Sequence, residues 1–173
     1  MKGFNQRERF ALSAAEGWLM LGCPVESERE LEAIGSENFD RPEVLCLRWA
    51  IAFRLKRWKD ARSVAEFWCW TAMDSLEAWM ALANATRESD GLEKAKKLLL
   101  RTAAQFPCEW VIPYNLACYC TQLGEIAEAV LWLNRALALD TSQRIQQAAA
   151  DDPDLAPLWK ILANEEPAEH LCS

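Results

Sequence analysis

The sequence has little of the residue types on which catalysis and metal binding most often depend. It contains one histidine, His170, and six glycines, and no stretch forms a glycine-rich phosphate loop, a serine elbow or a metal-ligand pair. His170 lies two residues from Cys172, but a frayed terminus cannot hold the geometry of a nucleophile and its base. The sequence therefore predicts no catalytic residue, no metal site and no cofactor.

Long apolar runs and an excess of positive charge are also missing. No run of about 18 apolar residues occurs, so no membrane span is predicted. The opening residues, MKGFNQRERF, are polar and lack the apolar centre of a signal peptide. The net charge of −7 disfavours nonspecific binding to nucleic acid, which needs positive charge facing phosphates. We expect a cytoplasmic protein with neither nucleic acid nor membrane as a partner.

The cysteines are consistent with that compartment. There are seven, an odd number, and most lie within helical patterns. This favours reduced, packed thiols over a disulfide framework. Cys118 and Cys120 do not indicate a metal site, because residues two apart on a helix point about 200° away from each other.

What the chain does contain is a repeated pattern of apolar residues. Ser27, Ala61, Ala95 and Ala129 each follow the last by 34 residues, and each falls in the second half of an apolar-periodic pair of segments. Small residues at such positions allow two helices to pack closely. A fixed period of 20–50 residues is the signature of a solenoid built from supersecondary units.

The residues on this period resemble tetratricopeptide repeats. The resemblance covers roughly residues 8–141 and is strongest in the third and fourth repeats. The segments Trp110–Tyr119 and Asp152–Trp159 also resemble the closing repeat of a group of bacterial tetratricopeptide proteins. The residues that carry the main resemblance are Trp79, Leu82, Ala83, Ala95 and Pro107, and then Leu116, Ala117, Gly124, Ala129, Ala136 and Leu137.

The expected fold is all-α. We predict a right-handed α-α superhelix, a tetratricopeptide-like solenoid of about four helical hairpins with a C-terminal capping helix. Residues 1–163 would form one solenoid domain, with repeats at about 8–41, 42–75, 76–109 and 110–141 and a cap at 142–163. The cap would be a broken helix, because Asp151, Asp152, Pro153 and Asp154 favour a helix stop and an N-cap over a cation site. Residues 164–173 would be a flexible acidic tail.

The tryptophans give two local predictions. Trp49 stands where the other repeats have Ala15, Ala83 and Ala117, so its ring would separate the second helix pair or shift its register. Trp68 and Trp70 cannot both face inward on one helix, because residues two apart diverge. One of them should therefore lie at a surface or an interface.

The resemblance implies a concave groove lined by the first helix of each pair. Such grooves hold a peptide or a partner helix without chemistry. Methionine and tyrosine suit a surface that accepts another chain, and asparagine can bind an extended backbone. The alternative is that these residues pack against the chain's own C-terminal helix or a second copy. The candidate ligand-binding residues are Leu47, Phe53, Met80, Asn84, Tyr114 and Asn115.

A basic run stands out in this acidic chain. Residues 41–62 contain seven arginines and lysines against two acidic residues, Glu43 and Asp60. A solvent-exposed helix face explains such a run. The functional alternative is that the run binds an acidic partner or the chain's own acidic tail.

These observations predict a non-catalytic protein-protein interaction module, not an enzyme, with a protein or peptide partner. One alternative is a small acidic chaperone of the tetratricopeptide type that holds a client protein. Another is a structural homo-oligomer, with a homodimer as its simplest form. The identity of the partner, the pathway and the oligomeric state are not encoded in any motif of the sequence.

Overall fold

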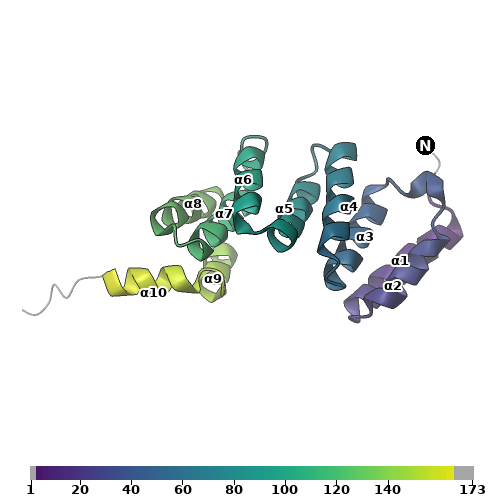
Figure 1. Cartoon of the computed structure of the whole chain (residues 1–173), viewed down its shortest axis with the longest axis horizontal. Coiled ribbons are helices and arrows are strands. Elements are labelled where there is room, and N and C mark those ends of the chain that lie inside the picture. The colour runs from purple at the N-terminus through teal and green to yellow at the C-terminus, as the bar shows by residue number, and fades with distance from the viewer. Residues whose placement is uncertain (1–2, 166–173) are drawn as a thin grey trace, which may run out of the picture. The chain divides into compact units, whose positions relative to one another are not determined.

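The structure, a computed structural model, describes residues 3–165, with only the backbone for 143, 144, 164 and 165. The described residues are mostly helical and contain no strand (Figure 1), which confirms the all-α prediction. Most of the predicted tail, residues 166–173, lies outside the described residues. The α-helices are α1 (Gln6–Met20), α2 (Pro24–Glu30), α3 (Pro42–Arg54), α4 (Trp58–Thr71), α5 (Leu76–Asp90), α6 (Leu92–Ala103), α7 (Val111–Gln122), α8 (Ile126–Leu139), α9 (Gln143–Asp151) and α10 (Ala156–Glu165), and two 3₁₀ turns are η1 (Leu31–Ala33) and η2 (Ser36–Asn38).

The chain divides into two compact units. The N-terminal unit is Met1–Gly91 and the C-terminal unit is Leu92–Ser173. In the N-terminal unit α3 contacts both α1 and α5, and α4 packs between α3 and α5; in the C-terminal unit α7 packs against α6, α8 and α10. The division falls within the third predicted repeat, and the predicted extents of the single domain and of its repeats remain predictions.

The 34-residue period appears directly in the helix boundaries. The second helices begin at Pro24, Trp58, Leu92 and Ile126, each 34 residues after the last. The small residue three positions into each of them, Ser27, Ala61, Ala95 and Ala129, is completely buried. In the first repeat, the Ser27 hydroxyl donates a hydrogen bond of 2.7 Å to the carbonyl oxygen of Ala15, so this pair of helices is joined by a buried polar contact as well as by close packing.

Local sequence explains the helix ends. Asn5 and Glu8 form a capping box at the start of α1, and the Ser75 hydroxyl accepts from the backbone N–H of Ala78 at the start of α5, as expected for a serine cap. Pro24 occupies the first turn of α2, where a missing N–H costs nothing. Gly22 and Gly124 close α1 and α7 with φ values of 76° and 77°, a conformation that glycine adopts without steric cost.

The connector between the first two repeats is held by a buried carboxylate and not by a helix cap. The second helix of the first repeat ends at Glu30, so Leu31 lies in η1 and Ile34 follows it. Asp40 does not cap α3, whose N-cap is Arg41 without a side-chain cap. Instead, the buried Glu8 organises this segment: one of its carboxylate oxygens accepts from Gly35 N at 3.0 Å and from Asn38 Nδ2 at 2.9 Å. A contact across about 30 residues of sequence carries no local signal.

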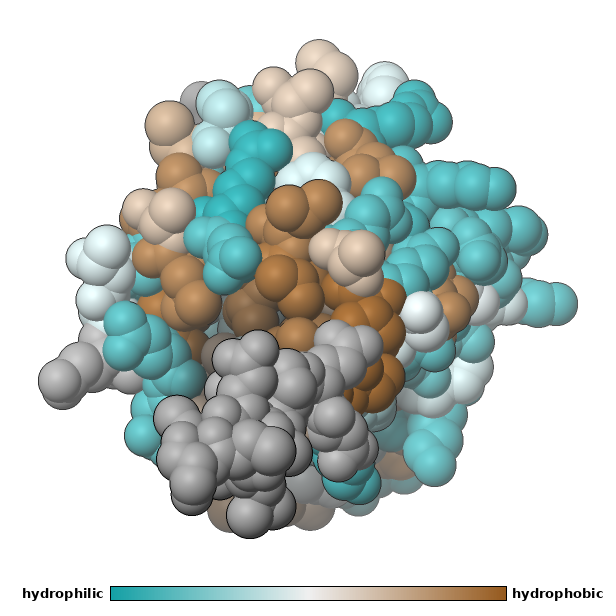
Figure 2. All heavy atoms as spheres, turned by 90° about the vertical axis from the view of Figure 1, so that its left-hand side faces the viewer, coloured by the Kyte–Doolittle hydropathy of each residue, from teal (hydrophilic) through white to brown (hydrophobic). Residues whose placement is uncertain are grey.

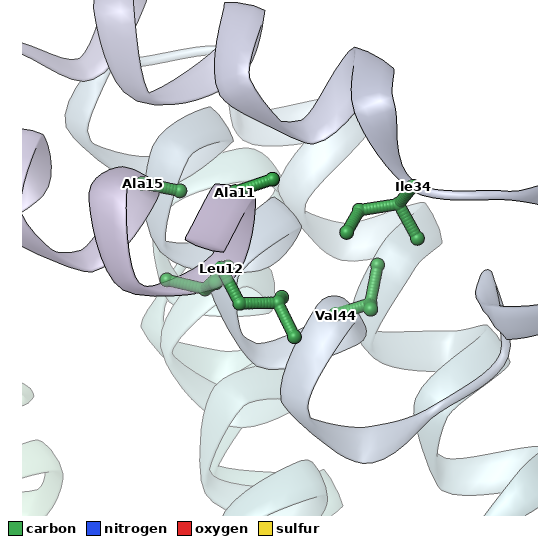
Figure 3. Packing of buried hydrophobic residues seen from close by; sticks show 6 residues of the cluster. Ala11, Leu12, Ala15, Ile34 and Val44 are labelled. Carbon is green, nitrogen blue, oxygen red and sulfur yellow. The ribbon is translucent and has the colours of Figure 1, made fainter. Parts of the chain in front are cut away.

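The core of the first repeat lies between α1, the connector and α3. Figure 3 shows Ala11, Leu12 and Ala15 of α1 facing Ile34 and Val44. All five are buried. Burial of Leu12, Ile34 and Val44 stabilises the fold by about 1.5–3 kcal/mol for each side chain through removal of its surface from water, so this cluster holds α1 on the rest of the N-terminal unit.

Trp49 is accommodated without loss of the second helix pair. Trp49 and Phe53 pack against a cluster of small buried residues, Ala52, Ala61 and Ala85, and α4 still packs on α3. The indole N–H of Trp49 is buried and has no hydrogen-bond partner within residues 3–165, which is unfavourable by about 1–3 kcal/mol.

Trp68 and Trp70 divide as predicted. Trp68 is 2% exposed and Trp70 is 75% exposed. The Trp70 ring lies 5.8 Å from that of Phe67, also exposed.

In the C-terminal unit, Figure 2 shows further hydrophobic side chains gathered at the end where α8 and α10 lie; on α8, Leu131 is 68% exposed. The last two described helices, α9 and α10, are separated by a break between Asp151 and Ala156, as the sequence predicted.

A candidate protein-binding face

The first helices of the N-terminal unit bring three side chains from distant parts of the sequence onto one face. Cys46 of α3 is exposed. Partial burial raises the pKa of its thiol, and the carboxylates of Glu77 on α5 and Glu16 on α1 raise it further. The helix that carries Cys46, α3, contacts both α1 and α5, and Glu16 and Glu77 are exposed as Cys46 is. Together with Met80 and Asn84, these three residues define what we call the first-helix face.

Met80 and Asn84 belong to this face by register. Met80 stands one period after Cys46, and Asn84 lies one turn further along α5. Both are partly exposed. No helix of the N-terminal unit covers Cys46, and Glu16 and Glu77 make no ion pair within the described residues. The face is thus an open surface of mixed polar and apolar character, with unneutralised negative charge.

Two further predicted contact residues of the N-terminal unit serve mainly in packing. Leu47 is only 6% exposed and belongs to the core cluster around Leu12 and Val44, so it offers little surface to a ligand. Phe53 is half-buried between two indole rings, 5.1 Å from Trp49 and 4.9 Å from Trp58. The structure does not bring Leu47 and Phe53 together with Cys46 as a common exposed surface.

Tyr114 and Asn115, the two candidates of the C-terminal unit, are already engaged within the chain. The Tyr114 hydroxyl donates to Asp152 Oδ2 at 2.7 Å, and the Asn115 side-chain amide donates to the carbonyl oxygen of Val111 in its own helix at 2.8 Å. Burial, and then the Asp152 carboxylate, raise the pKa of Tyr114. The segment between α9 and α10 therefore lies on the face of α7 that the period assigns to the groove.

A charged cluster around the buried Lys96 in the C-terminal unit was missed from the sequence. The Lys96 ammonium of α6 contacts the carboxylates of Glu125 and Glu128. Burial alone would lower the pKa of Lys96, but its hydrogen bonds to the two glutamates outweigh burial and raise it. Glu125 and Glu128 follow Lys96 by 29 and 32 positions, so no short sequence motif contains the cluster. Only the period, which stacks neighbouring helices, could have suggested the pairing.

The same cluster contains three groups of the kind that bind metals, with Cys120 beside Glu125 and Glu128. Two observations argue against a metal role. The Lys96 ammonium already pairs with both carboxylates, and burial raises the pKa of the Cys120 thiol to about 12, so the thiolate that a metal requires is disfavoured. The cluster is best explained as a structural ion pair network.

The described helices offer no candidate for crossing a membrane, since none combines enough length with enough hydrophobicity. No protein-family model matches the sequence, and no curated protein matches it either.

Solved structures of MamA do match. A MamA RS-1 double mutant superimposes with a TM-score of 0.66 at 14% identity, over 95% of this chain and 99% of that one. MamA from residue 41 to its end, from Desulfovibrio magneticus RS-1, superimposes with a TM-score of 0.65 at 13% identity, over 95% of this chain and 100% of that one. A further crystal structure of MamA gives 0.65 at 17% identity over 98% of each chain.

MamA is a tetratricopeptide-like, all-helical protein. The match therefore confirms the predicted fold class: the chain is an all-α protein with a tetratricopeptide-like solenoid fold. At these identities the similarity concerns the fold alone.

Proposed function

We propose that this protein is a non-catalytic interaction module that holds a peptide or a partner helix on the first-helix face of its N-terminal unit. The observation that carries the proposal is that three successive first helices pack in order, with α3 contacting both α1 and α5, and that Glu16, Cys46 and Glu77 are exposed on them. Repeat proteins bind other chains on the extended surfaces that such stacking creates.

The side chains of this face suit a protein ligand. Met80 is flexible and polarizable, so it adapts to different apolar partners. Asn84 can donate to and accept from the backbone of an extended segment. The α7 face of the C-terminal unit differs, because Asp152 and α10 contact it. The N-terminal unit therefore offers the more accessible surface.

The test is a capture experiment with matched charge changes. The tagged full chain is used as wild type, as Cys46→Arg and as Ser63→Arg, and retained proteins are identified by mass spectrometry. Cys46 and Ser63 are both exposed, so neither change disturbs the core, but Ser63 lies on the second helix α4. We expect a partner that binds the wild type and Ser63→Arg and is lost with Cys46→Arg. Equal retention by all three chains would contradict the proposed face.

One observation favours self-association as a second candidate. Trp70, Phe67 and Met73 are all exposed, at 75%, 43% and 66%, and large apolar groups gathered at a surface often mark an interface. In this reading a second copy covers Trp70. Sedimentation velocity over a range of concentrations tests it: the wild type should form a dimer that Trp70→Ser abolishes, and a monomer at all concentrations would remove this candidate.

A further inference from the structure

The turn between α3 and α4 contains an unusual backbone conformation. Lys56 has a φ of 57° and is the only residue other than glycine with a positive φ in the described part of the chain. One period before it stands Gly22, and two periods after it stands Gly124, both with positive φ. A side chain is disfavoured in this region because its Cβ crowds the following carbonyl oxygen. The chain thus keeps a lysine where the turn itself favours glycine.

Lys56 lines a shallow cleft in the N-terminal unit. The cleft has a volume of about 380 Å³, and its lining includes Arg57, Trp58 and Lys59 from the start of α4. Two carboxylates also border it, those of Asp60 and Glu88. The cleft shares no residue with the first-helix face.

Some charged groups of the cleft form ion pairs and others do not. The Arg57 guanidinium pairs with Glu28 and lies 3.9 Å from Asp60, and Glu88 lies 3.6 Å from Arg87. Lys56 and Lys59, by contrast, are exposed and form no ion pair or hydrogen bond within the described residues. Each carboxylate at the cleft therefore has a cationic neighbour, while two ammonium groups remain available to an incoming ligand.

We propose that this cleft binds an acidic segment of a partner protein, with its carboxylates against Lys56 and Lys59 and its apolar side chains against Trp58. Complementary charge orients such a segment and raises its rate of association. A protein segment fits better than a long polyphosphate chain. The net charge of the protein is −7, so an extended polyanion would meet repulsion beyond the cleft, whereas a short acidic segment contacts only the local cations.

The proposal is independent of the first-helix face, and its test uses a defined probe. A fluorescein-labelled peptide of Glu-Glu-Leu-Glu repeats is titrated with the full chain at low ionic strength, and binding is followed by fluorescence anisotropy. The variants are Lys56→Asn and Lys59→Gln. Asparagine tolerates a positive φ, so Lys56→Asn removes the charge while keeping the turn. The matched control is Lys97→Gln, which removes an exposed charge from α6 in the other unit.

We expect Lys56→Asn and Lys59→Gln each to weaken binding by up to about fivefold, Lys97→Gln to leave it unchanged, and the melting temperature of Lys56→Asn to be no lower than that of the wild type. Three results would overturn the proposal. The wild type fails to bind the peptide; Lys97→Gln weakens binding as much as Lys56→Asn does; or single-stranded DNA of the same charge binds more tightly than the peptide and responds to the same substitutions.

Discussion

The Tyr114 hydroxyl donates a 2.7 Å hydrogen bond to Asp152 Oδ2, and this bond ties α7 to the break between α9 and α10. The second Asp152 oxygen accepts from the backbone N–H of Asp154 at 2.8 Å. One carboxylate thus ends the broken helix and holds it on α7. The cap therefore occupies the surface that the repeat pattern alone would leave for a ligand, which directs the search for a binding face to the N-terminal unit.

Tyr114→Phe tests this tie. The substitution keeps the ring and its edge-on contact with Trp110, 5.9 Å away, and removes only the hydroxyl. We expect a loss of about 1 kcal/mol in the free energy of unfolding, measured with urea, because Asp152 loses one hydrogen bond. Asp152→Ala should cost at least as much. An unchanged stability in both variants would show that the cap is held by its apolar residues alone.

The lowered pKa of Glu8 predicts how the stability of the fold depends on pH. Its pKa is lowered from the ordinary value of 4.5 by hydrogen bonds from the backbone of Asn5 and Gly35 and from the Asn38 side chain. A carboxylate with a lowered folded-state pKa stabilises the fold above the unfolded pKa, and this contribution is lost as the pH falls through the folded pKa.

We therefore expect wild type to be more stable than Glu8→Gln at neutral pH, with the difference shrinking below pH about 4.5. Thermal unfolding of both chains from pH 7 to pH 3, followed by circular dichroism, measures this difference. The exposed Glu32 supplies the control substitution, Glu32→Gln. If the difference between wild type and Glu8→Gln were constant across the range, the Glu8 carboxylate would not be the titrating group.

Two glycines should respond to alanine in opposite directions. Gly17 lies inside α1, and a Cβ added there meets nothing within 4 Å, so Gly17→Ala should stabilise by about 0.5–1 kcal/mol. Gly124 has a φ of 77°, so Gly124→Ala should destabilise by about 1 kcal/mol or more. Chemical denaturation measures the change in the free energy of unfolding for both substitutions. Stabilisation by Gly124→Ala would contradict the left-handed turn that closes α7.

Removal of the Lys96 ammonium should destabilise the C-terminal unit. Lys96→Met keeps most of the aliphatic stem but leaves Glu125 and Glu128 unneutralised beside Cys120. The lysine side chain is 10% exposed, whereas the glutamates are 36% and 47% exposed, so water compensates part of the loss. We expect Lys96→Met to lower the free energy of unfolding by about 1–2 kcal/mol. The neighbouring exposed Lys97 provides the control: Lys97→Met should be close to neutral, and equal effects would argue against a specific role of Lys96.

The sequence predicted what depends on local chemistry and on the period. The small residues that the period places at helix contacts, Ala61, Ala95 and Ala129 among them, are completely buried. The exposure of Trp70 follows from helical geometry, since Trp68 takes the inward position.

What the sequence did not predict depends on contacts between distant segments. Glu8 reaches Asn38, and Lys96 reaches Glu128, across separations at which charge and amide patterns give no local signal. Leu47 could not be assigned to the core from its own helix, because its burial depends on the packing of α1 and of the connector. The left-handed conformation at Lys56 could not be predicted, because a lysine gives no indication of a positive φ.

The account rests on the claim that α1, α3 and α5 present one common face, and the reactivity of Cys46 tests this most directly. Alkylation by iodoacetamide at pH 8, quantified for the Cys46 peptide by mass spectrometry, reports how much of this thiol is ionised. Because Glu16 and Glu77 raise its pKa from two different helices, Glu16→Gln and Glu77→Gln should each accelerate alkylation of Cys46, and the double variant should accelerate it most, while Cys108 in the other unit reacts at an unchanged rate. A rate at Cys46 that is the same in all four chains would show that the three helices do not share this face.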